Sequence, residues 1–465
     1  MARPRQVRTL GVWMNGEHVG EWHSPSDGRH EFRYAPAWFE SPHARPISIF
    51  FPLRPPSAPY RQGVESFFEN LLPDSRAIRE RIQRRFTTRS ASAFDLLSQI
   101  GRDCVGALQL LPEGEEPGPI RQITGHRLSP DAIAQLLSNT LEGPAAGSEP
   151  EEDTFRISIA GAQEKTALLW HRKAWHRPTG TTPTTHILKL PIGTMPGGID
   201  LSTSVENEWL CAQILKAFGI PVAECRIESF GGFKTLVVER FDRKLAPDRS
   251  WWIRLPQEDF CQATGTPPAR KYEADGGPGI RKILEILLGS EDPAQDRRDF
   301  LRTQLVFWLL AATDGHAKNF SLLLKPGGSY RLTPRYDVLS AHPMIGTGLG
   351  KVAPQKLRMA MAVWGGNRHY RWKEIQPRHW LETARQCGVT GMREIAEELC
   401  DRTPTVLTRA QSSIPRGFPE PLANGILSGL KHAADTPRAG LTGIPFPPGI
   451  SLAAPRLRGQ KKTRG

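Results

Sequence analysis

The sequence lacks the features of several protein classes. No apolar run approaches the ~18 residues that a transmembrane helix needs, so we expect no membrane span. The first residues, MARPRQVRTLGVWMNGE, lack the apolar region of a signal peptide. The six Cys residues include no Cys-x-x-Cys pair, and their scatter indicates neither a zinc site nor a disulfide framework. This pattern is typical of a protein of the reduced cytoplasm.

Acidic residues are fewer than basic ones. Lys and Arg total 61 against 48 Asp and Glu, which gives a net charge of +13. Such a balance favours polyanionic partners, namely nucleic acid, nucleotide phosphates or acidic proteins, and an effect on solubility alone is the alternative. The chain has 465 residues, of which 38% are hydrophobic and 23% charged. These values predict a globular protein of two or three lobes.

The polar stretch 313–319 (TDGHAKN) carries the clearest chemical signal. It follows the most apolar run of the chain, 300–312 (FLRTQLVFWLLAA), whose large apolar residues recur at helical spacing. We therefore predict a buried helix that ends at the Thr-Asp-Gly turn. The segments 320–324 and 330–332, separated by Pro-Gly-Gly, then predict a hairpin.

The acids around this hairpin match the spacing of a protein-kinase catalytic loop. There, an Asp accepts the proton of the substrate hydroxyl, an Asn five residues later holds magnesium, and a second Asp beyond a hairpin binds the metal. Asp314 and Asn319 have the five-residue spacing, and Asp337 follows the hairpin. A solvated turn is the alternative, because Asp, Gly and Asn favour turns. The flanking helix, hairpin and second acid argue against that alternative.

Three weaker signals precede this loop. Residues 156–170 predict a strand, a Gly turn and a second strand, which either approach a phosphate or form an ordinary hairpin. No Gly directly precedes Lys165, so the turn is not a Walker A loop. Lys189 lies in a short apolar strand, where it either contacts nucleotide phosphates or occupies the solvated face. Glu208, in a helix opening near Ser204, either pairs with Lys189 or complements the helix dipole.

Composition and periodicity also predict an order of segments. We expect boundaries at 1–112 (N-terminal subdomain), 113–153 (connecting segment), 154–242 (nucleotide-binding part), 243–430 (helical C-terminal lobe) and 431–465 (basic, disordered tail). The tail either contacts nucleic acid or is a solvated end. We further expect a hairpin with its turn at Asn15-Gly16 and strands at 31–34, 47–53, 105–110 and 236–242. Helices are expected at 63–68, 76–84, 129–137, 255–261, 378–386, 392–400 and 405–412. Residues 272–279 are expected to form a helix and a Gly-rich loop.

Several longer motifs occur in a specific order. They are SIAGAQEKTALL, THILKLP, VENEWL, VVERFDR, RLPQEDFCQ, KYEADGGPGI, ATDGHAKNFS and SYRLTPRYDVLSA. Together they resemble the HipA family of serine/threonine-protein kinase toxins, closely from about residue 150 to 415 and more loosely before that. The resemblance implies an α+β, two-lobed, protein-kinase-like fold with a small N-terminal α/β subdomain and a mainly helical C-terminal lobe.

The resemblance also implies roles for particular residues. Asp314 matches the catalytic base, Asn319 and Asp337 match the metal ligands, and Ser158 matches the autophosphorylation site, whose modification accompanies an inactive, ejected loop. The implied ATP-binding set comprises the phosphate loop, the strand lysine, the hinge, the catalytic loop and its partner acid: Ala160, Gly161, Ala162, Gln163, Glu164, Lys165, Lys189, Glu239, Arg240, Phe241, Asp314, Gly315, His316, Ala317, Lys318, Asn319, Tyr336 and Asp337.

A member of this family is expected to be an ATP- and Mg²⁺-dependent Ser/Thr kinase and the toxin of a toxin–antitoxin pair. Its implied partners are a helix-turn-helix antitoxin, operator DNA through the antitoxin complex, and a protein substrate, glutamate–tRNA ligase, whose modification causes growth arrest and persistence. Its implied location is the bacterial cytoplasm, with the nucleoid when in the antitoxin complex. Two alternatives stay open: a nucleotide-sensing corepressor with little transferase activity, motivated by the +13 charge, and transfer of an adenylyl group.

Overall fold

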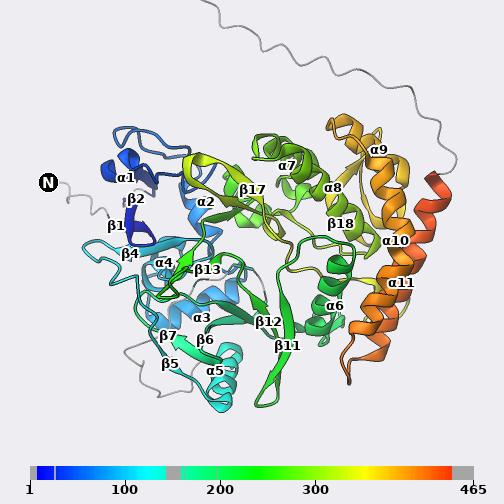
Figure 1. Cartoon of the computed structure of the whole chain (residues 1–465), viewed down its shortest axis with the longest axis horizontal. Coiled ribbons are helices and arrows are strands. Elements are labelled where there is room, and N and C mark those ends of the chain that lie inside the picture. The colour runs from blue at the N-terminus through cyan, green and yellow to red at the C-terminus, as the bar shows by residue number, and fades with distance from the viewer. Residues whose placement is uncertain are drawn as a thin grey trace, which may run out of the picture.

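The computed structural model describes residues 8–25, 28–142, 158, 160–161, 163–195 and 197–441. Figure 1 shows them as an α+β structure in which an N-terminal module lies beside a sheet-containing lobe and a helical lobe. Within these residues, none of the helices combines the length and the apolar character that a membrane crossing requires.

The N-terminal module has an apolar core of its own, in which Trp22 stacks on Phe68. Asn15 and Gly16 join its first two strands with φ of 48° and 84°, the positive values that a two-residue hairpin turn requires. The predicted hairpin is thus confirmed. The antiparallel sheet has the order β3-β2-β1-β4. The elements are β1 (Arg8–Met14), β2 (Glu17–Ser24), β3 (Glu31–Tyr34), α1 (Pro36–Glu40), α2 (Val64–Glu69), α3 (Arg76–Phe86), α4 (Ala93–Ile100) and β4 (Leu108–Pro112).

The sheet lobe follows, built on a six-stranded sheet of order β11-β12-β8-β6-β7-β5. The segment 113–153, expected as a connection, supplies an edge strand and a helix to this lobe. The helix α6 is buried on most sides because it lies between the sheet and the helical lobe (Figure 1). The elements are β5 (Gly125–Arg127), α5 (Pro130–Glu142), β6 (Lys165–His171), β7 (Ala174–Pro178), β8 (His186–Lys189), β9 (Gly193–Thr194), β10 (Asp200–Leu201), α6 (Ser204–Ala217), β11 (Cys225–Phe230) and β12 (Phe233–Glu239).

The helical lobe is centred on α8, whose last three turns are buried. The predicted buried helix before the 313–319 loop and the hairpin after it, β16 with β17, are both confirmed. The elements are β13 (Arg243–Leu245), β14 (Trp252–Arg254), β15 (Gln257–Asp259), α7 (Ile280–Ile286), α8 (Pro293–Leu309), β16 (Ser321–Leu324), β17 (Tyr330–Leu332), β18 (Arg358–Trp364), β19 (Arg368–Arg371), α9 (Pro377–Gln386), α10 (Met392–Ser413) and α11 (Glu420–Leu441).

Two predictions were wrong because contacts with residues distant in sequence determine the backbone conformation. Residues 47–53 form a tight turn instead of a strand, because the Glu258 carboxylate accepts hydrogen bonds from Ser48 Oγ at 2.5 Å and the Ile49 amide at 2.8 Å. Residues 255–261 contain the strand β15 instead of a helix, because they pair with β16 across the lobe. Neither partner is close in sequence.

Two further predictions failed near the C-terminus. The expected helices at 392–400 and 405–412 are one helix, α10, which continues through Pro404. Its two halves bury Leu399 and Val406 in the same core, which offsets the hydrogen bond lost at proline. The expected tail from residue 431 begins later, because α11 reaches Leu441 and buries Leu430. Residues 442–465 lie outside the described residues.

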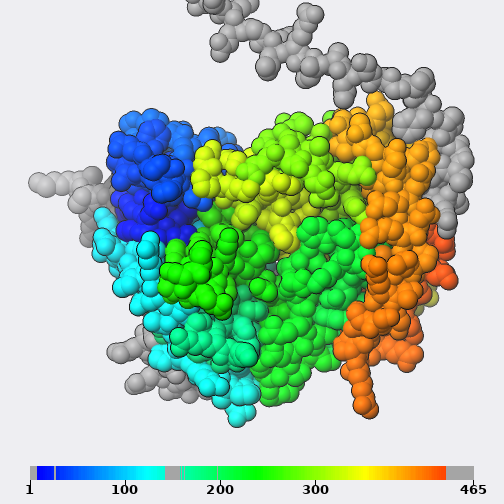
Figure 2. Space-filling view, viewed as in Figure 1, coloured from blue at the N-terminus to red at the C-terminus, as the bar shows by residue number. Residues whose placement is uncertain are grey.

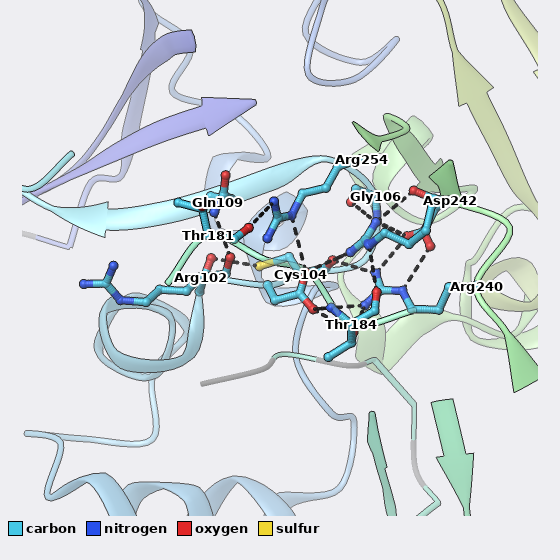
Figure 3. Close-up of polar contacts among 12 residues, drawn as sticks. Arg102, Cys104, Gly106, Gln109, Thr181, Thr184, Arg240, Asp242 and Arg254 are labelled. Carbon is cyan, nitrogen blue, oxygen red and sulfur yellow. Dashed lines mark hydrogen bonds and ion pairs between the residues drawn. The ribbon is translucent and has the colours of Figure 1, made fainter. Parts of the chain in front are cut away.

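A buried polar network joins the N-terminal module to the end of β12. The Asp103 carboxylate accepts hydrogen bonds from Arg243 Nη2 at 2.9 Å and Thr184 Oγ1 at 2.7 Å. Arg240 holds Asp242 through Nε at 3.0 Å and Nη2 at 2.8 Å. Figure 3 shows Arg240 and Asp242 meeting the backbone around Cys104 and Gly106, with Arg254 reaching the same cluster from the other side.

The network keeps its acids charged inside the protein. Burial acts to raise the pKa of Asp103, but Arg243, Arg240 and Arg254 outweigh it, so the pKa lies well below its ordinary value. Backbone carbonyl groups, including that of Cys104, accept further guanidinium protons. Every charge in the cluster therefore has a partner, as burial of charge demands.

We expect Asp103→Asn to destabilise the protein strongly, because it keeps the side-chain shape and leaves buried guanidinium groups without their counter-ion. Loss of one partner of a buried pair costs about 3–5 kcal/mol of unfolding free energy. Urea unfolding measures this. The control is Glu80→Gln, which removes the exposed pair with Arg76 on α3 and should cost about 0.5 kcal/mol or less. Similar losses in the two variants would contradict a special role for the network.

Candidate active site between the lobes

The loop after α8 is held by backbone contacts on both sides. The Ala312 amide donates to Phe307 O at 2.8 Å and closes the helix, and Ala311 takes the left-handed conformation with φ of 47°. The Ala360 amide on β18 donates to Thr313 O at 2.9 Å. Asn319 stabilises the turn of the loop, because its Oδ1 accepts a hydrogen bond from the His316 amide at 3.1 Å. The loop is thus fixed relative to the core of the helical lobe.

Four charged or polar side chains from distant elements, Lys189, Glu208, Asn319 and Asp337, meet at one end of the cleft. Lys189 Nζ lies 2.6 Å from Glu208 Oε1 and 3.0 Å from Asp337 Oδ1. Asn319 Nδ2 lies 3.2 Å from Asp337 Oδ2. Asp337 has a φ of 61°, a conformation that few residues other than Gly, Asn and Asp adopt at low cost. The question left open for Glu208 is settled, since it pairs with Lys189.

The charges of this cluster support one another. Burial acts to lower the pKa of Lys189, but Asp337 and Glu208 outweigh it and the pKa is raised. Burial acts to raise the pKa of Asp337, but Lys189 and Lys165 outweigh it and the pKa lies well below its ordinary value. Burial, together with the charge of Lys189, lowers the pKa of Lys165 to about 8. Two lysines, Lys165 and Lys189, and two acids, Glu208 and Asp337, therefore balance in charge at this end of the cleft.

A cavity of about 210 Å³ opens beside the cluster. The predicted residues that line it come from every part of the expected ATP set: Ala160, Gly161, Gln163, Lys165, Lys189, Glu239, Arg240, Phe241, Asp314, His316, Lys318, Asn319, Tyr336 and Asp337. Apolar side chains, among them Ile187, Ala223, Val238 and Leu339, line another part. The cavity thus combines an apolar region with an end that carries lysines and acids, a combination that suits a nucleotide and its metal.

The Gly turn is held close to the cleft by the N-terminal module. The Asp74 amide donates to Gly161 O at 3.0 Å, and Gln163 Nε2 donates to Leu190 O at 2.5 Å. Gly161 has a φ of 109°, and a Cβ there would lie 2.5 Å from Lys165 Nζ. Glycine is therefore required at this position for both backbone conformation and close approach.

Four of the predicted residues do not line the cavity in the described structure. Glu164 turns away to pair with Arg81 on α3. A side chain at Gly315 would meet the ring of Phe307, and Ala317 is buried in the core. Ala162 lies outside the described residues.

Ser158 and Arg240 are held away from the cavity by other contacts. The Ser158 hydroxyl is fully buried, and it donates to Leu71 O at 2.7 Å. Arg240 lines the cavity near the hinge, but its guanidinium points into the network with Asp242. The ring of Phe241 lies 5.8 Å from that of Tyr336, where the two aromatic residues narrow the apolar part of the cavity.

The sequence reasoning missed residues of the N-terminal module that reach the catalytic loop. Asp74 Oδ1 accepts from Lys318 Nζ at 2.8 Å, and its Oδ2 accepts from Lys271 Nζ at 2.9 Å. Burial acts to raise the pKa of Asp74, but the two lysines outweigh it and lower the pKa to about 2. Asp74 and Lys318 are far apart in sequence, and neither lies in a pattern that predicts contact.

Two more missed residues belong to motifs that the sequence displays without assigning them roles. Tyr272 donates its hydroxyl proton to Asp314 Oδ1 at 2.6 Å, and its ring lies edge-on to His316. Asp259 lines the cavity, and its burial raises its pKa to about 6, against the opposing charge of Lys318. Tyr272 lies in the motif KYEADGGPGI and Asp259 in RLPQEDFCQ. Their place in these motifs was the sequence feature that could have indicated a role in the site.

The side chains fit a metal that arrives with phosphates. No group of three or more His, Cys, Asp and Glu among the described residues is arranged to hold a metal alone. Asp337 offers a carboxylate, and Asn319 Oδ1, which accepts one hydrogen bond from the loop, keeps a second lone pair. Mg²⁺ takes one or two protein oxygens and completes its coordination with phosphate and water, so these two residues suit Mg²⁺ bound to a nucleotide.

Comparison with known proteins gives a consistent result. Models of the HipA N-terminal domain and the HipA-like C-terminal domain match residues 10–111 and 157–407. Y4mE of Sinorhizobium fredii, named as a candidate kinase, is 34% identical over 393 residues, covering 82% of this chain and 86% of that protein. The serine/threonine-protein kinase toxin HipA of Shewanella oneidensis is 27% identical over 288 residues, covering 60% of this chain and 63% of that protein.

A solved structure shows the same fold. The Shewanella oneidensis MR-1 toxin–antitoxin complex of HipA, HipB and operator DNA contains a chain that superposes with a TM-score of 0.74 at 21% identity, covering 93% of this chain and 98% of that one. The expected two-lobed, kinase-like α+β fold is confirmed.

We expect Asp74→Asn to lower stability near neutral pH by about 2 kcal/mol, because the pKa of Asp74 falls from 3.8 to about 2 on folding. An acid with a lowered folded-state pKa stabilises the protein above its unfolded-state pKa. That contribution is lost as the pH falls from about 4 toward 2. Urea unfolding of both proteins between pH 7 and pH 3 measures the difference, which should shrink at the acidic end. A difference that stays constant with pH would mean that packing, rather than charge, is lost.

Proposed function

The chain belongs to the HipA family, and from that premise we propose that it is an ATP- and Mg²⁺-dependent serine/threonine protein kinase that acts as the toxin of a toxin–antitoxin pair. The observation that carries the proposal is the meeting of Lys189, Asn319 and Asp337 at one end of a cavity that Asp314 also lines. Phosphoryl transfer depends mainly on position and charge, and this arrangement supplies both.

Each residue has a role in the proposed reaction. Lys189, oriented by Glu208, holds the phosphates of ATP, with the Gly161 turn and Lys165 beside it. Asp337 and Asn319 hold Mg²⁺, which neutralises the charge that develops on the phosphates. The backbone of the hinge, Glu239 to Phe241, and the apolar lining hold the adenine.

Asp314 orients the hydroxyl of the protein substrate and accepts its proton as the oxygen attacks the terminal phosphorus. The Tyr272 hydroxyl occupies this hydrogen-bonding position in the structure. A substrate hydroxyl therefore either displaces Tyr272 from Oδ1 or bonds to the second carboxylate oxygen of Asp314, Oδ2.

Regulation and partners follow from the same premise. We propose that Ser158 is an autophosphorylation site. Its hydroxyl is buried against Leu71, so phosphorylation requires the segment to leave the cleft edge. The relative from Shewanella oneidensis was solved with HipB and operator DNA, which supports a helix-turn-helix antitoxin and a repressing complex on operator DNA for this chain as well. We further propose glutamate–tRNA ligase as the substrate, growth arrest and persistence as the outcome, and a cytoplasmic location that includes the nucleoid in the antitoxin complex.

We expect Asp314→Asn to reduce transfer of the terminal phosphate from ATP by about 10² to 10⁴-fold, because a positioned base contributes that much. Binding of ATP should persist, because Asp314 contacts Tyr272 and not Lys189. Radiolabelled ATP and mass analysis of the product measure transfer, with Asp275→Asn as an exposed control. Transfer near the wild-type rate would show that Asp314 is not the base. Nucleotide binding without transfer in the wild-type protein would instead support a nucleotide-sensing corepressor, and a nucleotide adduct on the target would indicate adenylyl transfer.

We expect removal of divalent metal with a chelator to abolish transfer and Mg²⁺ to restore it. Asp337→Asn should weaken ATP binding in the presence of Mg²⁺ more than in its absence, since it removes a metal ligand. Calorimetric titration with ATP, with and without Mg²⁺, measures both affinities. If the variant loses the same affinity in both conditions, Asp337 acts through Lys189 and not through a metal.

A further inference from the structure

A second, larger cavity lies on the helical lobe, outside the ATP site. Its volume is about 610 Å³, and its wall is formed by the segment after Tyr272 and by α7, α8 and β18. Four basic and two acidic side chains line it: Arg281, Lys282, Arg297, Arg368, Glu273 and Glu285. None of these residues has a role in the reaction described above.

Trp364 lines this cavity and contacts two of its arginines. The guanidinium groups of Arg281 and Arg368 lie 4.5 Å and 4.9 Å from the centre of its ring, one from α7 and one from β19. Stacking on an aromatic face holds a guanidinium in place while its N–H groups stay free to bind an anion. Across the described ranges, neither Arg281 nor Arg368 has a carboxylate within ion-pair distance.

Two buried polar groups of the same cavity lack partners. Trp364 Nε1 and Arg297 Nε are buried and, among the described residues, make no hydrogen bond. Both are donors, and a buried donor without an acceptor costs free energy. The cavity lining also carries more basic than acidic side chains, four against two.

The cavity connects directly to the catalytic loop. Glu273, which lines it, follows Tyr272, whose hydroxyl bonds to Asp314. Glu273 Oε2 accepts from the Ala362 amide of β18 at 2.6 Å. The same strand bonds the loop through the Ala360 amide and Thr313 O. A ligand in this cavity thus contacts Glu273, which follows Tyr272 in sequence and is hydrogen-bonded to the strand that holds the catalytic loop.

We propose that this cavity, defined by Arg281, Arg368 and Trp364, docks an acidic segment of the protein substrate during phosphorylation. The inference rests on the proposed kinase function and deepens it by naming the substrate class. Carboxylates suit the paired guanidinium groups, which bind them in a bidentate manner. An acidic peptide fits better than a nucleic acid because Leu288, which lines the cavity, is exposed and suits an apolar side chain of a peptide.

The first test measures binding without any chemistry. A fluorescent oligoglutamate peptide with one Leu is titrated with the full chain, wild type or Arg281→Gln with Arg368→Gln, and its anisotropy is followed. We expect the double variant to bind at least about tenfold more weakly. The matched control is Arg409→Gln with Arg416→Gln, which removes the same charge from exposed positions of the C-terminal region and should bind within about twofold of wild type.

Unchanged affinity in the double variant would overturn the proposal, as would tighter binding of an RNA oligonucleotide that competes with the peptide at this cavity. Unfolding temperatures of all variants are compared first. If the glutamine variant proves unstable, Arg368→Lys is used in its place, because it keeps the charge and removes the stacked, bidentate geometry. We expect Arg368→Lys to weaken binding of the peptide severalfold.

The second test uses phosphorylation of serine peptides that carry an acidic run. We expect the double variant to raise KM for these peptides about tenfold and to leave kcat and the KM for ATP unchanged, because the cavity contacts neither ATP nor the reacting atoms. If wild type phosphorylates such peptides and the variant does so with the same KM, the docking proposal fails and the kinase proposal stands. If wild type binds the acidic peptide through Arg281 and Arg368 but phosphorylates no protein or peptide, the docking site stands as a binding site and the kinase proposal fails.

Discussion

The buried contacts between Asp103, Asp242 and the three arginines around them are the constraint on which the rest of the structure depends. Arg240 belongs to the segment that lines the adenine side of the cavity, while Asp103 belongs to the N-terminal module. Removing one partner from ion pairs buried this deeply is strongly destabilising. Separating the N-terminal module from the hinge would break these pairs and therefore destabilise the protein.

The same principle operates on the other side of the cleft. Asp74, from the N-terminal module, holds Lys318 of the catalytic loop and Lys271 beside Tyr272. Its backbone also holds the Gly161 turn. A module without reacting groups of its own thus positions both the phosphate-binding turn and the catalytic loop. Figure 2 shows this module in contact with the lobes, and the Gly327 amide donates to Ala44 O at one point of that surface.

Local sequence predicted those parts of the fold that local forces decide. The Asn15-Gly16 hairpin, the helix α8 and the hairpin β16–β17 depend on turn conformation and on the spacing of apolar residues, both of which are visible in a short stretch of chain. Predictions were wrong where a residue distant in sequence determines the backbone conformation, as Glu258 does for residues 47–53. They were also wrong where burial of both halves of a helix in one core lets the helix continue through a proline, as in α10.

For the site, the sequence by itself determined the five-residue spacing of Asp314 and Asn319, because residues this close in one loop keep their spacing whatever the rest of the chain does. Only the tertiary structure decided that Glu208 pairs with Lys189, that Glu164 turns away from the cavity, and that Tyr272 bonds to Asp314. The physical reason is that these contacts join segments far apart in sequence. Their energies come from burial and from opposite charge brought within about 3 Å, neither of which exists before the chain has folded.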